Sequence, residues 1–233
     1  MYQFDWSILW GEGGRLLVQG ALMTLELAAL SLVLALALGF LFGVLRWSQF
    51  GPLRPFCWLY VEVLRNTPPL VQILFWYFSA TVILPPSLIM VLRDVGFQFV
   101  AVVFALGVYH SGFIAEIVRG GLNAIPRGQY EAAEAIGFGF AQSVRYILLP
   151  QLVRIVAPSI VNESVSLTKN TSLALAIGVA DITYQARHID YTSFRGVEAL
   201  TATTLFYLVV CTTISGFGHL LQRRLSRHRR SAA

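Results

Sequence analysis

The residues most able to do chemistry lie in an apolar stretch near position 165. Lys169 is the sole lysine of the chain, and apolar residues flank its segment on both sides. A charge inside the hydrocarbon layer costs about 2.5–3.5 kcal/mol, so we expect Lys169 to face protein or water. At the helical repeat of about 100° per residue, it shares an arc of roughly 120° with other polar side chains. That arc contains Asn162, Glu163, Ser166, Lys169 and Asn170. A polar face this wide could line an aqueous path.

The same residues allow a purely structural interpretation, in which Lys169 pairs with Glu163 or with a group on another helix. A second stripe of small residues, Ser164, Thr168 and Ser172, could pack against a neighbouring helix. Glu26 is the other membrane carboxylate, and it could face a path or the lipid interface. The sequence does not choose between these alternatives.

A second pattern predicts a short helix outside the apolar stretches. From Asn123 to Gly137 the chain reads Asn-Ala-Ile-Pro-Arg-Gly-Gln-Tyr-Glu-Ala-Ala-Glu-Ala-Ile-Gly. Pro126 can begin a helix, and Glu131 falls early in it, where the helix dipole favours acidic groups. The alanines are strong helix formers, and Gly137 interrupts the run. A small, rigid helix of this kind suits docking into a cleft of a partner protein.

The elements that must position these residues are predicted to be membrane helices. Hydrophobic residues make up 56% of the 233 residues and charged residues 12%, about half the charged share of a soluble domain. A hydrocarbon core of about 30 Å needs roughly 20 helical residues. We therefore expect an all-α integral membrane protein of about five spans, forming one domain over 1–233. The expected spans are 22–45, 62–84, 99–118, 155–180 and 200–221, with Pro68-Pro69 interrupting the second and a hydrophilic loop at 119–154.

The distribution of arginine predicts how the chain is oriented. Arginines on the side of the 119–154 loop and the C-terminal tail outnumber those on the other side by about twelve to four. Because positive residues favour the cytoplasmic side, we expect a periplasmic N-terminus and a cytoplasmic C-terminus. The basic tail is interpreted as a topology anchor against anionic lipid, not as a nucleic-acid site. It contains Arg223, Arg224, Arg227, Arg229 and Arg230.

At this point three motifs make the sequence similar to a known family. The loop has Glu131-Ala-Ala, then Gly137, Ile147 and Leu149-Pro150 at the spacing of the EAA loop of ABC importer permeases. The segment Arg65–Gln72 resembles the R-N/G-T-P-L-L-V-Q segment of polar amino acid permeases, although Pro69 stands where leucine is usual. The stretch from Lys169 to Val179 resembles their K-D/N-T-S-L and I-G-V residues.

The resemblance implies the permease subunit of a type I ABC importer in a bacterial inner membrane. It implies a second permease chain, identical or homologous, two ATPase subunits and a periplasmic binding protein that delivers the substrate. ATP and Mg²⁺ would bind the ATPase subunits, because this chain has no GxxxxGK[ST] motif and is not expected to be an enzyme. Glu131, Ala132, Ala133 and Gly137 would couple to the ATPase. Lys169, with Asn170 and Ser166, would meet the carboxylate of a passing amino acid, with glutamate or aspartate as the leading substrate and glutamine next.

Other classes of function account for fewer of these features. An ion-coupled secondary transporter could use Glu163 and Lys169, but such carriers often contain an internal repeat, and the EAA loop would have no role in one. A membrane-embedded enzyme lacks support from any HExxH or nucleophile motif. The cysteines and histidines have no metal-site spacing, so neither a metal nor a cofactor is expected in this chain.

Overall fold

In a computed structural model, the residues that the structure describes, which are 4–48 and 52–230, form helices joined by turns and loops. Within these ranges, the side chains at 127, 130, 140 and 225–230 are not described, so three tail arginines of the predicted anchor lie outside the described side chains. In chain order the elements are η1 Trp6–Trp10, α1 Glu12–Trp47, α2 Arg54–Arg65, α3 Pro69–Ile83, α4 Pro86–Val95, α5 Phe97–Asn123, α6 Arg127–Ala135, α7 Phe140–Gln142, the π-helix η2 Ser143–Leu148, α8 Leu149–Asn170, the 3-10 helix η3 Thr171–Ile177, α9 Ile182–Ser193 and α10 Gly196–Arg230.

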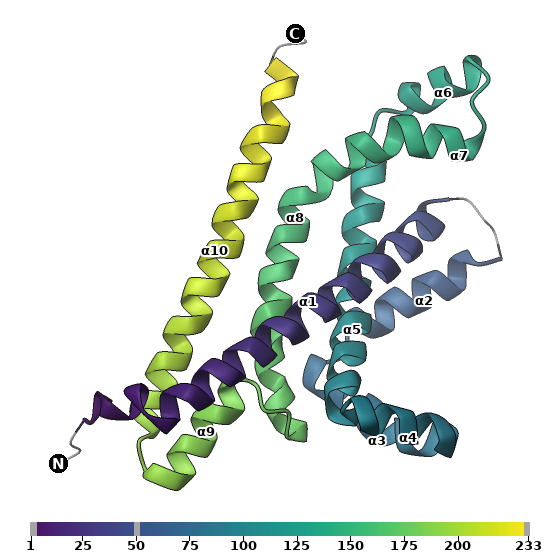
Figure 1. Cartoon of the computed structure of the whole chain (residues 1–233). Coiled ribbons are helices and arrows are strands. Elements are labelled where there is room, and N and C mark those ends of the chain that lie inside the picture. The colour runs from purple at the N-terminus through teal and green to yellow at the C-terminus, as the bar shows by residue number, and fades with distance from the viewer. Residues whose placement is uncertain (1–3, 49–51, 231–233) are drawn as a thin grey trace.

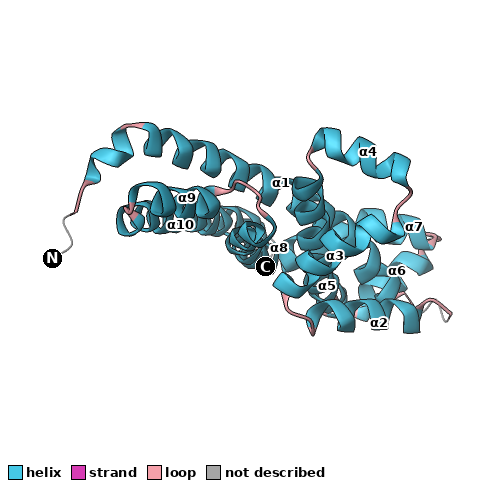
Figure 2. Cartoon of the chain, turned by 90° about the horizontal axis from the view of Figure 1, so that it is seen from below, coloured by secondary structure: helices cyan, strands magenta, loops and turns pink. Residues whose placement is uncertain are grey.

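The long helix α1 organises the fold. It crosses the molecule obliquely (Figure 1) and contacts α5, α8 and α9. Seen from below in Figure 2, α8, α9 and α10 lie on one side and α2 to α7 on the other, and α1 extends from the first group toward the second. At one end of the molecule, here called the α6 end, lie α6, α7 and the C-terminal part of α10. The N-terminus and α9 lie at the opposite end, here called the α9 end.

Small residues form most of the buried stripe of α1, which also contains Leu17 and Leu27, while many of its large apolar residues point outward. The buried positions include Gly20, Thr24, Ser31, Gly39 and Gly43. Outward-facing residues of the same helix include Val18, Leu22, Leu30, Val33 and Leu41. This is the pattern of a helix in lipid, where close backbone approach favours small residues and the lipid covers the large ones.

The predicted span at 62–84 is wrong as a single helix. The chain leaves the helical conformation between Asn66 and Pro68, and Pro68 is extended with φ −63° and ψ 140°. The physical reason is the Pro68-Pro69 pair, because a proline disfavours helical geometry in the residue before it and lacks the backbone donor. Four helical segments of the described chain are long and apolar enough to cross a membrane, and α3 is a shorter apolar helix. The fifth span therefore stays a prediction that rests on α3.

The other predicted spans lie within longer helices, with one further correction. The segments 22–45, 99–118 and 200–221 fall inside α1, α5 and α10. The segment 155–180 does not continue as an α-helix, because α8 ends at Asn170 and the chain tightens into η3. Gly178, with φ 81°, then turns the chain toward α9. The helices α4 and α9 were not predicted.

Candidate functional site

The EAA segment forms the exposed helix α6. Pro126 is its extended N-cap, so the helix begins where the sequence predicts. Glu131, Ala132 and Glu134 are exposed, whereas Ala133 is 1% exposed and packs inside the loop. The helix therefore presents a small surface bearing carboxylates and keeps one alanine for its own packing.

A glycine turn ends α6 and fixes its direction. The Gly137 N–H donates to the Glu134 carbonyl at 2.9 Å, and the Phe138 N–H donates to the Ala133 carbonyl at 3.0 Å. Gly137 has φ 86°, in the left-handed region that favours glycine. Together these are the two hydrogen bonds of a Schellman motif. The predicted bend at Gly137 is therefore present as a defined turn.

Both arms of this loop are anchored in the membrane part of the chain. Leu122 and Ile125 lead into α6, and Leu148 and Leu152 lead out of it through η2 and α8. All four side chains are buried in one core cluster, which α1 also joins through Ala35. A displacement of α6 would therefore be transmitted to α1, α5 and α8 through packed side chains.

The polar face of α8 is divided in the structure. Asn162 and Lys169 are exposed, while Glu163, Ser166 and Asn170 are half-buried. Two of these residues, Glu163 and Asn170, contact α5, so they do not face an open path. The open part of the face consists of Asn162, Ser166 and Lys169.

His110 of α5 is the partner that holds Glu163 and Asn170. Its side chain is fully buried, with Nδ1 2.5 Å from Glu163 Oε1 and Nε2 3.2 Å from the Asn170 amide nitrogen. A neutral imidazole with its proton on Nδ1 satisfies both contacts, donating to the carboxylate and accepting from the amide. His110 lies inside the predicted span at 99–118, where a polar side chain is expected to have a partner in the protein.

Lys169 lies in the last turn of α8, and the apolar helical segment that contains it continues through η3 to Ile177. It forms no ion pair with any residue that the structure describes, so the predicted alternative of a Lys169–Glu163 pair is not present. A cation in the last helical turn is favoured by the carbonyl ends of the helix dipole. Lys169 is exposed as a residue.

The second stripe on α8 is largely a packing surface. Ser164 and Thr168 are buried, and Thr168 donates to the Ser164 carbonyl at 2.8 Å. Ser172 lies beyond the end of α8, in η3, and is half-buried. Glu26 is exposed on α1 while its neighbours Thr24 and Leu27 are buried, so it points away from the helices packed against α1.

Comparison with known proteins gives this architecture a family. The family described as "Binding-protein-dependent transport system inner membrane component" matches residues 32–227, which is most of the chain. The chain belongs to this family. It is also 35% identical over 224 residues to the glutamine transport system permease protein GlnP of Escherichia coli K12, covering 96% of this chain and 98% of that protein.

Two further relatives in the family are named for the transport of different amino acids. The arginine transport system permease protein ArtQ of Bacillus subtilis strain 168 is 32% identical, with 90% of this chain and 92% of ArtQ covered. The glutamate/aspartate import permease protein GltJ of Escherichia coli K12 is 33% identical, with 88% and 85% covered. The predicted resemblance to amino acid ABC permeases is confirmed at the level of the family.

A solved structure supports the fold of this inner membrane component. An amino acid ABC transporter crystallised with histidines has a chain that matches with a TM-score of 0.81 and 30% identity, covering 96% of this chain and 100% of that one. The predicted all-helical permease fold is therefore confirmed. The number of spans and their orientation remain predictions.

Proposed function

We propose that this inner membrane component is the permease subunit of an ATP-driven amino acid importer. The proposal rests on the structure of α6. The EAA sequence forms an exposed helix whose direction is set by the Gly137 turn. A surface helix of this kind, anchored at both ends in the membrane core, is suited to receive a force from another protein. The importer would work in the bacterial inner membrane, with the α6 end in the cytoplasm.

In this proposal, ATP and Mg²⁺ bind two ATPase subunits, and each α6 of a pair of permease chains docks on one of them. Closure of the ATPase pair draws the two α6 helices together and opens the path outward, and hydrolysis resets it. Glu131 and Ala132 supply exposed contacts on α6. Ala133 and Gly137 keep the helix in place, because one is packed within the loop and the other forms the turn. A binding protein delivers the substrate on the opposite side.

The open part of α8 is proposed to line the substrate path. Lys169 is exposed and has no ion-pair partner among the described residues, and it can bind the carboxylate that every amino acid carries. Asn162 and Ser166 share this side of the helix. Glu163 and Asn170 support this face instead of lining the path, because their contacts with His110 hold α8 against α5.

For the substrate, we propose a polar amino acid, with glutamate or aspartate as the leading candidate and glutamine next. The positive Lys169 suits an acidic solute. The relatives carry the names of glutamine, arginine and glutamate/aspartate systems, so likeness to them favours the class and does not distinguish its members.

The test is uptake into proteoliposomes that contain this chain, its partner permease, the ATPase subunits and the binding protein. Labelled glutamate, aspartate, glutamine, arginine and histidine are offered with and without internal ATP. We expect ATP-dependent uptake of one of them, abolished by Glu131→Lys. Gly137→Ala should also lower ATP-dependent uptake, because alanine is strained at a positive φ.

Matched variants separate coupling from damage to the fold. Asp94→Lys reverses an exposed charge in α4 and should leave uptake unchanged. Gly128→Ala lies in α6 itself, where an added Cβ meets nothing within 4 Å, and should also be neutral. Lys169→Ala should raise the KM for the substrate while ATP hydrolysis by the complex continues. Uptake driven by an ion gradient without ATP, and unaffected by Glu131→Lys, would instead identify a secondary transporter.

A further inference from the structure

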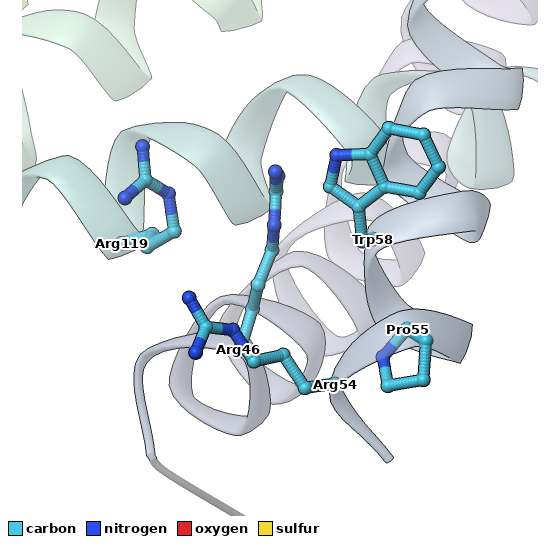
Figure 3. A pocket seen from close by; sticks show the side chains of 5 residues that line it. All are labelled: Arg46, Arg54, Pro55, Trp58 and Arg119. Carbon is cyan, nitrogen blue, oxygen red and sulfur yellow. The ribbon is translucent and has the colours of Figure 1, made fainter. Parts of the chain in front are cut away.

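A basic pocket lies where the end of α1, the start of α2 and the C-terminal part of α5 meet, apart from the polar face of α8 and from α6 itself. It has a volume of about 380 Å³ and is lined by Arg46, Arg54, Pro55, Trp58 and Arg119. The arginines come from three elements: the last turn of α1, the first residue of α2 and the C-terminal part of α5. Figure 3 shows their guanidinium groups on one side of the pocket and Trp58 with Pro55 on the other.

Positive charge exceeds negative charge at this pocket. Arg46 contacts Glu116 at 2.6 Å and lies 3.9 Å from Glu62, and Arg119 pairs with the same Glu116. Arg54 is exposed and forms no ion pair with any other residue that the structure describes. Three guanidinium groups thus stand against two carboxylates, and one of these carboxylates, Glu116, is shared by Arg46 and Arg119. An anion would balance the charge, and guanidinium groups bind phosphate through paired N–H donors.

The surroundings of the pocket indicate that this anion carries an apolar tail. Trp58 is 52% exposed, and the neighbouring Phe56 and Leu59 on α2 are 63% and 54% exposed. Free phosphate would cover none of this apolar surface, whereas the acyl chains of a lipid would. Tryptophan and arginine are also the side chains that favour the depth of lipid headgroups, where α1 ends.

We propose that this pocket binds the phosphate headgroup of an anionic phospholipid in the leaflet next to the α6 end. Arg54, Arg119 and Arg46 hold the phosphate, and Trp58 lies against the glycerol and upper acyl chains. Basic pockets between membrane helices are a recurrent solution for binding such headgroups. Because Arg46 and Arg119 belong to α1 and α5, the bound lipid would join α1 to the helix that leads into α6. The proposal does not depend on which solute the protein transports.

The test is native mass spectrometry of the intact permease–ATPase complex, titrated with phosphatidylglycerol or with phosphatidylcholine of the same acyl chains. We expect preferential retention of phosphatidylglycerol, weakened about fivefold by Arg54→Gln. Arg54 is exposed and unpaired within the described chain, so this change should leave the fold intact. Arg93→Gln, which removes an exposed arginine from the last turn of α4, is the matched control and should have no effect.

Four results would overturn the proposal. Equal retention of the two lipids would show that the charge excess selects no headgroup. Displacement of phosphatidylglycerol by millimolar inorganic phosphate would assign the pocket to a free anion. Loss of the lipid whenever the ATPase subunits are bound would make the pocket a protein-docking surface. A parallel loss with Arg54→Gln and Arg93→Gln would also contradict it, since only one of these residues lines the pocket.

Discussion

At the scale of single side chains, His110 joins two membrane helices through both of its ring nitrogens. Its contacts with Glu163 and Asn170 connect α5 to α8 at a depth where few polar partners are available. A buried acceptor that loses its partner costs about 1–3 kcal/mol, more when it is charged. His110 is therefore a positioning residue for the polar face of α8.

Replacing His110 with leucine should lower the free energy of unfolding by about 1–3 kcal/mol, because the Glu163 carboxylate then keeps no hydrogen bond to α5. Glu163→Gln should be much milder, since a glutamine oxygen can still accept from Nδ1. Thermal unfolding of the purified complex in detergent would compare the variants. If His110→Leu and Glu163→Gln lowered the unfolding midpoint equally, the bond would have no special role.

Asp181, which follows the last turn of η3 and lies outside the membrane-spanning segments, should make stability depend on pH. Its side chain is fully buried and caps α9 by accepting from the Tyr184 N–H at 2.9 Å. Burial raises the pKa of Asp181 to about 6, although backbone hydrogen bonds from Tyr184 and Thr183 oppose the rise. The native state thus holds this proton more tightly than the unfolded chain does.

The sign of the effect follows from that difference. The contribution of Asp181 is largest below its unfolded pKa of 3.8 and is lost as the pH rises through about 6, a decrease of about 3 kcal/mol in unfolding free energy. Asp181→Asn keeps a capping side chain and does not titrate, so it should remove this part of the pH dependence. Unfolding midpoints of both proteins at pH 4, 5, 6 and 7 measure it. Parallel curves for the two proteins would contradict the assignment.

At the scale of elements, the fit between α1 and α5 depends on glycines that bring the two backbones together. A Cβ added at Gly43 would lie 2.7 Å from Val118 Cβ and 2.8 Å from the Ala115 carbonyl oxygen. The backbone oxygen cannot yield as a flexible side chain can. Gly43→Ala should therefore separate the helices and cost about 1–3 kcal/mol, as overpacking does.

The matched control for this change is Gly216→Ala in α10, where an added Cβ meets nothing within 4 Å. There the substitution should be neutral or stabilising, by up to about 1 kcal/mol, because alanine favours the helix more than glycine does. Thermal unfolding of the two variants in the same detergent separates the two effects. An unchanged unfolding midpoint for Gly43→Ala would show that α1 and α5 can move apart without a loss of stability.

Local sequence signals predicted some of these elements and could not predict others. Pro126 and Gly137 act on their own neighbours, so the start and the turn of α6 were both predictable. The buried stripe of α1 was not, because in lipid the outward face is as apolar as the buried one and hydropathy shows no contrast. The contacts of His110 link residues 53 and 60 positions apart, and they depend on how α5 meets α8. The break before Pro69 was recognisable as an interruption, but its consequence, two separate helices, was not.

At the scale of the whole molecule, the structure has two distinct ends, and the predicted orientation assigns them to opposite sides of the membrane. The α6 end contains α6, α7 and the C-terminal part of α10, whereas α9 and the N-terminus lie at the other end (Figure 1). Glu134 on α6 and Thr192 on α9 are both exposed, so each can report the side of the membrane on which its end lies. Positive residues favour the cytoplasmic side, and Arg46, Arg54 and Arg119 all belong to the α6 end.

We therefore expect a cysteine at Thr192 to react with a membrane-impermeant maleimide in cells whose outer barrier has been opened, and a cysteine at Glu134 to react only after the inner membrane is broken. The native Cys57 and Cys211 are replaced by alanine first, because either free thiol would add background. Labelling of the Thr192→Cys and Glu134→Cys proteins with a permeant maleimide checks that both thiols are reactive. The opposite pattern would invert the chain and place α6 out of reach of cytoplasmic ATP. Labelling of both from outside would mean that the two ends do not lie on opposite sides of the membrane, and that α1, α5 and α8 do not cross it as proposed.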